Sequence, residues 1–466
     1  MKQVEKPTTE NKVHFISLGC PKNLVDTEIM VGTLMKDGYK IVAEEEEADT
    51  VIINTCGFIE DSKRESIQRI IEMGELKKQG KIKRLVVAGC LTQRYKSDIV
   101  DELPEADLFV GSGEFQNINK ILDENKKGSE KKTFFNLPTY LQDSSTPRVN
   151  TQPKHRAYLK ISEGCLKRCA FCAIPLIRGN LQSRTIDNVV NEAKLLVAGG
   201  VKEIIIISHD FTDYGWDLKR KNPEAKESPY ELLKALDQVE GLQWIRLLYL
   251  YPDGLDMETL KLIKNSKKIV KYFDMPLQHI NNEVLKKMNR KMTKEEITEV
   301  VKNIRTLMPE AIIRTQFIVG FPGETEEQFN ELVEFIKENE FDRVGCFSYS
   351  PEENTPAGKM VDQLDDETKQ RRHDTLMKTQ QKISKKLQKR MIGKVLDVIV
   401  EGLSEETDLL LQGRNSQQAP DIDGVTLINS GTADVGQIVK VRITDSLEYD
   451  LIGEIVEISE AGEIIQ

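Results

Sequence analysis

Three cysteines, Cys165, Cys169 and Cys172, have a C-x3-C-x2-C spacing that suits an iron–sulfur cluster. A 4Fe-4S cube has four irons, and cysteine thiolates are its usual ligands. Three local ligands leave one iron open, and an open metal position is typical of catalysis rather than scaffolding. The alternatives are a zinc site or buried structural thiols. Zinc sites favour two C-x2-4-C pairs or Cys/His pairs, and no fourth ligand lies nearby. The spacing therefore predicts an iron–sulfur site with a vacant iron.

A second set of cysteines, Cys20, Cys56 and Cys90, is spread along the first part of the chain. Each follows a short apolar run that reads as a strand, and each has a glycine beside it: Gly19, Gly57 and Gly89. Because the carboxyl ends of parallel strands share one edge of a sheet, three thiols placed there can converge. We predict a second cluster at that edge, again with a free iron. The seventh cysteine, Cys346, lies within an expected strand and is assigned to the core.

The elements that must position these cysteines alternate between strands and helices, as a parallel α/β sheet requires. In the first part we expect strands at 13–18, 50–54, 84–88 and 107–110, and helices at 22–37, 60–78 and 92–101. Later strands are expected at 157–162, 203–208, 244–250, 268–276, 311–319 and 343–350, with helices between them such as Glu324–Glu338. The first group predicts a doubly wound parallel-sheet domain. The second predicts a partial (β/α)6 barrel, since a closed one needs eight units.

The C-terminal part of the chain has a different sequence pattern. A very polar helix, interpreted as a solvated linker, is expected at 366–390, and alternating strands such as 394–400 follow, broken by Gly and Asp turns. This pattern predicts a small antiparallel β-barrel. The fold class is α/β with three domains, and the predicted bounds are 12–127, 151–383 and 386–458, with a linker at 128–150.

Composition indicates a soluble globular protein of 466 residues, with 39% hydrophobic and 30% charged residues. We find no secretory signal and no apolar run long enough to cross a membrane, and seven cysteines do not suggest a disulfide framework. We therefore expect a cytoplasmic protein without a membrane partner. The net charge of -10 argues against DNA, whose binding depends on neutralising phosphates.

Over nearly its whole length the chain resembles the radical S-adenosylmethionine (SAM) methylthiotransferases. The resemblance implies an N-terminal cluster domain, a radical SAM partial barrel and a C-terminal TRAM domain. It also implies insertion of a methylthio group at an unactivated carbon, with two SAM molecules and two 4Fe-4S clusters. By the same resemblance, Cys165, Cys169 and Cys172 bind the radical SAM cluster, and Cys20, Cys56 and Cys90 bind an auxiliary one.

The family has one branch that acts on tRNA adenosine and another that acts on an aspartate of a ribosomal protein. Six stretches resemble the ribosomal branch: Gly19–Asn23, Asn54–Ile59, Tyr249–Pro252, Pro276–His279, Gly320–Thr325 and Ala419–Gly424. The resemblance implies modification of the aspartate β-carbon in the twelfth protein of the small ribosomal subunit, giving 3-methylthioaspartate. That basic protein is the expected partner, together with an electron donor such as a flavodoxin or ferredoxin. The alternatives are a tRNA adenosine methylthiotransferase and a non-catalytic iron–sulfur maturation factor that binds ribosomes.

Asp210, His279 and Arg314 are expected at the carboxyl ends of barrel strands, where ligands gather, and are candidates for contacts to SAM or substrate. Each is at least as well explained as a structural hydrogen-bonding group. The sequence singles out no catalytic acid, base or nucleophile. Four residues depart from the family pattern, namely Leu166, His209, Phe211 and Asn354. The change at His209 leaves its role open. Asn354 replaces a glycine, and Asn tolerates left-handed backbone.

The charge of the C-terminal part bears on the substrate. From Met391 onward there are 4 basic and 15 acidic residues, a net charge of -11. TRAM modules often bind RNA, but this charge repels phosphates and attracts a partner rich in Lys and Arg. The charge therefore favours a protein substrate, with mere solubility of the domain as the alternative explanation.

Overall fold

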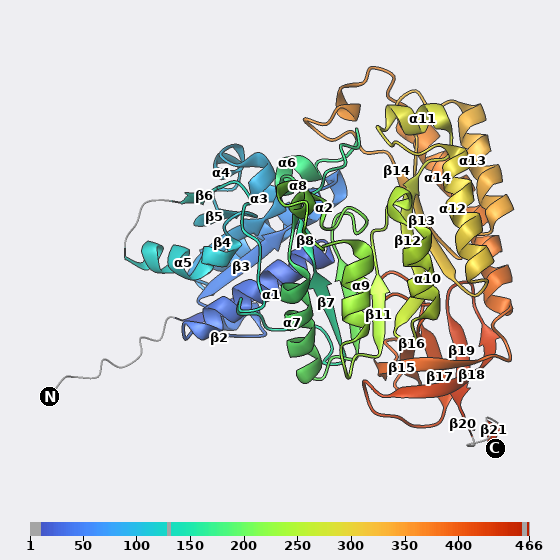
Figure 1. Cartoon of the computed structure of the whole chain (residues 1–466). Coiled ribbons are helices and arrows are strands. Elements are labelled where there is room, and N and C mark those ends of the chain that lie inside the picture. The colour runs from blue at the N-terminus through green and yellow to red at the C-terminus, as the bar shows by residue number, and fades with distance from the viewer. Residues whose placement is uncertain (1–10, 128–131, 459–463, 466) are drawn as a thin grey trace. The chain divides into compact units, whose positions relative to one another are not determined.

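The computed structural model describes residues 11–127, 132–458 and 464–465 (Figure 1). Contacts divide the chain into two compact units. The first comprises Met1–Thr151, Lys160–Val189 and Glu352–Thr355, and the second comprises Gln152–Leu159, Val190–Pro351 and Pro356–Gln466. In the described residues, no helix combines the length and the apolar character that a membrane span requires.

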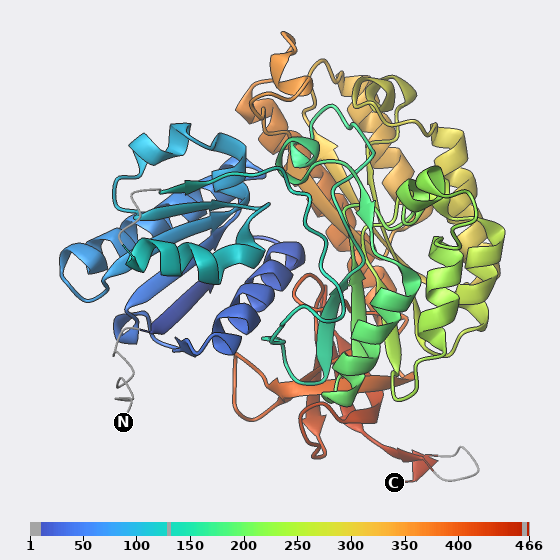
Figure 2. The same ribbon diagram turned by 60° about the vertical axis from the view of Figure 1, so that its left-hand side comes forward.

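The first unit contains a six-stranded sheet in the order β2-β1-β3-β4-β5-β6, in which all neighbours run parallel. Its strands are β1 Lys12–Ser17, β2 Lys40–Ile41, β3 Thr50–Thr55, β4 Arg84–Gly89, β5 Leu108–Gly111 and β6 Thr133–Phe134. The helices α1 Pro21–Lys36, α2 Glu60–Lys78, α3 Cys90–Tyr95, α4 Asp98–Glu102 and α5 Ile118–Lys126 cover both faces (Figure 2). The doubly wound domain is confirmed.

Two details of this domain differ from the expectation. The edge strands β2 and β6 are two residues long, too short to show an alternating pattern, and β6 falls in the predicted linker. The single helix expected at 92–101 is two helices, because Lys96 adopts a left-handed backbone with φ of 49° and ends α3. Such a residue cannot continue a right-handed helix.

The strand order places a topological switch point between β1 and β3. From β1 the chain moves outward to β2 and then crosses back to β3 on the other side of β1. In open α/β sheets, ligands bind outside the carboxyl ends of the strands at such a point. The loops that leave β1 and β3 are therefore the expected place for a cofactor.

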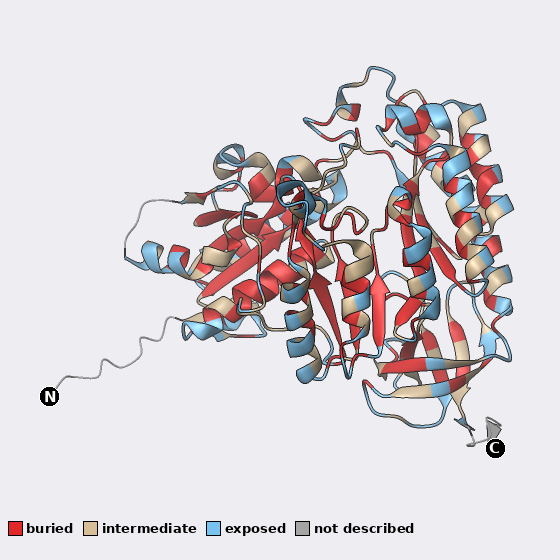
Figure 3. Cartoon of the chain, in the orientation of Figure 1, coloured by how far each residue is buried: buried red, intermediate tan, exposed pale blue. Residues whose placement is uncertain are grey.

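The second sheet has the order β14-β13-β12-β11-β10-β7, and the strands from β10 to β14 pair in parallel. Its strands are β7 Arg156–Lys160, β10 Glu203–Ile207, β11 Trp244–Leu247, β12 Ile269–Gln278, β13 Ile312–Val319 and β14 Arg343–Ser348. The helices are α7 Ile186–Ala198, α8 Trp216–Lys221, α9 Pro229–Asp237, α10 Met257–Asn265, α11 Asn282–Lys287, α12 Lys294–Leu307 and α13 Glu326–Asn339. The sheet stays open, so the partial barrel is confirmed, and its strands are largely buried (Figure 3).

Helix α14, Asp366–Lys389, is not the solvated linker that its polar sequence indicated. It packs against β14 and α13, and it buries Arg372, Gln380 and Gln388. The Arg372 guanidinium bonds Glu324 at 2.7 Å, and the Gln380 amide donates to the Phe341 carbonyl at 2.8 Å. A polar helix can thus bury one face when its buried side chains form hydrogen bonds and ion pairs.

The C-terminal strands form a closed barrel in the order β15-β16-β17-β19-β18. They are β15 Val395–Leu403, β16 Leu411–Asn415, β17 Thr426–Ser430, β18 Ile438–Ser446 and β19 Leu451–Ile455, and a short pair, β20 Glu457–Ile458 and β21 Ile464–Ile465, follows. Val398, Val400, Ile428, Val441 and Ile443 fill the interior. The predicted barrel is confirmed, although β17 and β19 run parallel while the other neighbours are antiparallel.

A buried ion network attaches this barrel to the second sheet. Glu203, the first residue of β10, bonds Arg414 of β16 at 2.7 Å and Arg246 of β11 at 2.8 Å. Burial alone would raise the pKa of Glu203, but Arg414 and Arg246 outweigh it and hold that pKa at about 2. Arg414 also bonds Glu401 at 2.9 Å. The barrel is therefore joined to the sheet by the buried charges of Glu203, Arg246 and Arg414.

Replacing Arg414 with Met should lower the free energy of unfolding by about 3–5 kcal/mol, because it leaves buried carboxylates with too few cations. The matched control is Arg442→Met in the same barrel, whose partner Glu454 lies in a more exposed pair. That change should cost about 1 kcal/mol or less. Urea unfolding of the metal-free chain measures both, and equal losses would contradict the structural role of the buried network.

Candidate functional site

The three early cysteines stand at the carboxyl ends of adjacent strands. Cys20 is the N-cap of α1, directly after the turn that follows β1. Cys56 follows the last residue of β3, and Cys90 is the first residue of α3, directly after β4. Cys20 and Cys56 therefore flank the switch point between β1 and β3, and Cys90 lies at the next strand along.

Glycines allow the loops that carry these cysteines to touch. A Cβ atom at Gly19 would lie 2.7 Å from the Cβ of Cys56 and 3.0 Å from its Sγ. A Cβ atom at Gly57 would lie 2.7 Å from the Cα of Leu91, the neighbour of Cys90. Real side chains never approach so closely, so the three loops meet only because both positions are glycine.

Asn23 connects the same three loops. Its side-chain amide donates to the carbonyls of Leu18 at 3.0 Å and Thr55 at 2.8 Å. Its backbone carbonyl accepts from the Asn54 amide at 2.8 Å, and its Oδ1 lies 3.3 Å from the Cys90 Sγ. One buried side chain thus ties the loops after β1, β3 and β4 together.

The later cysteines lie on a loop closed at its base. β8 Ser162–Glu163 pairs antiparallel with β9 Gln182–Ser183, and α6 Ile174–Arg178 lies between them. The Cys165 amide donates to the Gly179 carbonyl at 3.2 Å, and the Cys172 amide donates to the Cys169 carbonyl at 3.1 Å. All three thiols on this loop are partly exposed. The loop is therefore ordered by its own backbone, while its thiols stay accessible.

Both cysteine sets belong to the first unit. Helix α6, which begins two residues after Cys172, packs against α3, which begins at Cys90 (Figure 1). Cys90 shares a small apolar cluster with Ala173 and Ile177. Loops that are far apart in the sequence are thus brought together in one compact part of the chain.

The thiols differ in their electrostatic surroundings. Burial raises the pKa of Cys90 to about 12, although Arg178 opposes the shift, and burial also raises the pKa of Cys56. Thiols with such pKa values are poor free nucleophiles, but coordination to a metal deprotonates them outright. The environment of these two cysteines therefore suits ligands better than nucleophiles.

The donor set fits 4Fe-4S clusters. Each group offers three thiols, the ligand that such clusters prefer. In the part of the chain that the structure describes, no three His, Cys, Asp or Glu side chains converge tightly enough to hold a single metal ion. A cube binds each thiolate at a different iron, so its ligands surround a volume and need not meet at a point. The glycines at the first group supply the close backbone approach that such a volume requires.

A buried charge cluster, made of Asp26, Lys160, Glu163 and Arg178, adjoins the cysteines. Arg178 bonds Asp26 at 2.6 Å, and Lys160 bonds Glu163 at 3.0 Å. Sequence analysis missed this cluster because its members come from α1, β7, β8 and α6. The one available signal was Glu163, which stands two residues before Cys165.

The three candidates for SAM or substrate contacts lie in the second unit, and their roles stay predictions. Asp210 follows β10 and accepts bonds from the Thr212 amide at 2.8 Å and hydroxyl at 2.6 Å. His279 is fully buried and bonds Glu324 at 3.1 Å. Arg314 is the third residue of β13, not at its carboxyl end as expected, and bonds Asp274 at 2.6 Å. These contacts agree with the structural alternative for His279 and Arg314.

Of the departures from the family pattern, Asn354 is explained by its backbone. It has φ of 62°, in the left-handed region that glycine favours and that asparagine tolerates better than most residues. Its neighbour Glu352 bonds Arg94 at 2.8 Å and Lys63 at 3.2 Å within the first unit. The exchange of glycine for asparagine at this turn is therefore mild.

Family models match three parts of the chain. Residues 12–111 match "Uncharacterized protein family UPF0004", residues 159–336 match the radical SAM superfamily, and residues 392–456 match the TRAM domain. The domain bounds that we gave from the sequence stay predictions beside these matches.

Curated relatives extend over almost the whole chain. A ribosomal protein uS12 methylthiotransferase RimO from Bdellovibrio bacteriovorus is 73% identical and covers 97% of this chain and 99% of its own. The RimO of Geobacter sulfurreducens is 49% identical, over 96% of this chain and 99% of its own. The chain belongs to the RimO family of radical SAM methylthiotransferases. The family resemblance seen in the sequence is therefore confirmed, and the cofactors are SAM and 4Fe-4S clusters.

Solved structures support the fold alone. The radical SAM methyltransferase TsrM from Kitasatospora setae, solved with tryptophan and a SAM analogue, has a TM-score of 0.52 and 14% identity. The match covers 75% of this chain and 75% of that one. At this identity the likeness confirms a radical SAM architecture and says nothing of substrate.

The two cysteine groups should bind iron independently. Anaerobically reconstituted chain should hold about eight irons, since each 4Fe-4S cluster carries four. Changing Cys20, Cys56 and Cys90 to Ala should halve the iron and sulfide content, and so should changing Cys165, Cys169 and Cys172. Cys346→Ala is the control and should leave both unchanged. Loss of all iron from either triple variant would contradict two separate sites.

Proposed function

We propose that the chain adds a methylthio group to the β-carbon of an aspartate in ribosomal protein uS12, giving 3-methylthioaspartate. The observation that carries this proposal is the near full-length likeness to curated uS12 methylthiotransferases. The geometry agrees, because both groups of cysteines lie on ordered loops of one unit. We further propose that the enzyme works in the cytoplasm, where ribosomes are made, with a flavodoxin or ferredoxin as its electron donor.

The chain's own residues have distinct tasks in this proposal. Cys165, Cys169 and Cys172 would hold the radical SAM cluster, and Cys20, Cys56 and Cys90 would hold the auxiliary cluster. When bound, the first cluster would supply the electron that cleaves SAM, and the auxiliary cluster would hold the sulfur that is transferred. The burial of Cys90 would help to exclude water from a cluster bound there, and the partly exposed cysteines at 165–172 would stay accessible to SAM. Water exclusion matters because reactive intermediates are otherwise quenched.

The acidic barrel supports a basic protein as the substrate. Several of its carboxylates are paired with cations, including Glu401 with Arg414 and the more exposed Asp421 with Arg156. Others stay exposed, notably Glu405, Glu406 and Asp408 on the loop between β15 and β16. Leu409 on the same loop is 89% exposed. A negative loop with an apolar residue can attract a basic protein by charge and then hold it by contact.

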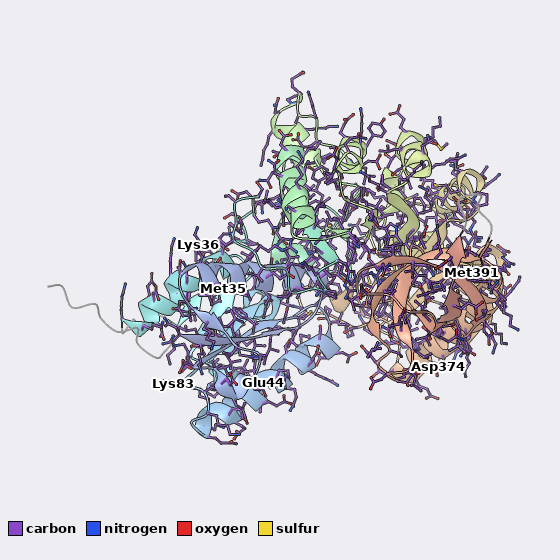
Figure 4. All side chains as sticks on the ribbon, turned by 90° about the horizontal axis from the view of Figure 1, so that it is seen from below. Met35, Lys36, Glu44, Lys83, Asp374 and Met391 are labelled. Atoms are coloured by element: carbon purple, nitrogen blue, oxygen red, sulfur yellow. The ribbon has the colours of Figure 1, made fainter. Side chains whose placement is uncertain are left out.

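Reversing the charge of this loop should weaken substrate binding. We expect Glu405→Lys/Glu406→Lys to raise the KM for uS12 several-fold at low salt, with the difference shrinking as salt screens the charges. The control is Glu44→Lys/Glu47→Lys, an equal charge change at exposed positions of the first unit, where Figure 4 labels Glu44. Equal increases in KM for the two variants would show that only the net charge of the protein matters for substrate binding.

A direct substrate comparison tests the function itself. Reconstituted enzyme with SAM and a reductant should add methylthio mass to uS12, at the target aspartate, and add none to tRNA. Modified tRNA adenosine with unmodified uS12 would support the other branch of the family. Stable ribosome binding with no turnover of SAM would instead support a non-catalytic maturation factor.

A further inference from the structure

We propose that Arg178 is a positioning residue of the auxiliary site, which holds the Cys90 sulfur by a hydrogen bond and so raises the reduction potential of the cluster bound there. The inference rests on the proposed function, because it requires Cys20, Cys56 and Cys90 to bind a cluster. It adds a residue from outside the N-terminal domain to that site.

The guanidinium of Arg178 connects four groups at once. Its Nη2 donates to the Asn23 Oδ1 at 2.6 Å and to the Cys90 Sγ at 3.2 Å. Its Nη1 bonds Asp26 at 2.6 Å and Glu163 at 3.4 Å. A planar guanidinium group with several N–H donors can bond such partners together, which a single ammonium group cannot.

The position of Arg178 along the chain gives this contact its importance. It is the last residue of α6, which starts two residues after Cys172. Its partner Asn23 is the same residue that ties the loops of Cys20, Cys56 and Cys90 together. Arg178 therefore links the segment that carries one group of cysteines to the loops that carry the other.

Arg178 belongs to a cluster whose charges balance. Asp26 and Glu163 supply two negative charges, and Lys160 and Arg178 supply two positive ones, with each residue at most 4% exposed. Lys160 bonds both carboxylates, at 2.5 and 3.0 Å. Of these two cations, Arg178 is the one with a hydrogen bond to the Cys90 sulfur. Substitutions can therefore remove the hydrogen bond to the Cys90 sulfur and be compared with others that change the charge of the cluster by the same amount.

A hydrogen bond to a ligating sulfur stabilises the more reduced cluster. A cysteine thiolate bound to iron can only accept hydrogen bonds, so Arg178 is the donor when the site is filled. Donors to cluster sulfurs and nearby positive charge are among the factors that set reduction potential. Removal of the Arg178 contact should therefore shift the potential of the auxiliary cluster to a more negative value.

The experiment uses the chain with Cys165, Cys169 and Cys172 changed to Ala, so that the auxiliary cluster alone is present. Two double variants are compared in it: Arg178→Met/Asp26→Asn and Lys160→Met/Asp26→Asn. Each leaves one buried cation and one buried carboxylate, so their charge is matched. We expect a redox titration followed by electron paramagnetic resonance to give a more negative midpoint for the Arg178 variant.

Equal midpoints in the two variants, or a more negative one for the Lys160 variant, would overturn the role of Arg178. So would an Arg178 variant whose midpoint equals that of the parent. If the parent itself binds no iron, the assignment of Cys20, Cys56 and Cys90 fails instead, and the proposed function fails with it. If the Arg178 variant alone binds no iron while circular dichroism shows that it is folded, Arg178 is needed to hold the cluster, and the proposed effect on its potential is overturned.

Discussion

Paired charges in the protein interior govern how this chain assembles. A buried carboxylate costs several kcal/mol unless a cation meets it with good geometry. Asp26 and Arg178 are 152 positions apart, and Glu203 and Arg414 are 211 positions apart, yet each pair is in close contact and almost inaccessible to water. Segments that carry these residues must therefore come together in one arrangement. Cofactor loops and the C-terminal barrel both take their positions from this requirement.

Strand order supplies the second constraint on the site. In the first sheet, the strand order reverses between β1 and β3, which is where ligands bind in open α/β sheets, and Cys20 and Cys56 stand on the two sides of this point. Glycines occupy the places where the loops at this edge touch, because a larger side chain there would clash with the neighbouring loop. A cluster site in this domain thus follows from topology first and from side-chain chemistry second.

Much of the fold and of the cysteine sites could be predicted from the sequence. The other features could not, for physical reasons. Strong β-branched runs such as Glu203–Ile207 predicted their strands, because they are buried on every side. The short edges β2 and β6 have no such pattern. Arg314 was wrongly assigned to a carboxyl end, since the expected strand 311–319 and the observed β13 Ile312–Val319 both place it near the start. The role of Arg178 could not be predicted for another reason. Its partners Asn23, Asp26 and Cys90 lie on distant elements, and local periodicity does not indicate a tertiary contact.

The buried pairs of Glu203 and Glu401 with Arg414 bear on how such enzymes could be altered. A barrel from the tRNA branch, grafted onto this sheet, would have to bring its own arginine to that place or leave the buried carboxylate of Glu203 with Arg246 as its remaining partner. Chimeras that exchange the module alone should therefore misfold more often than those that also exchange the matching face of β10. The barrel and the face of β10 that it contacts therefore have to be exchanged together.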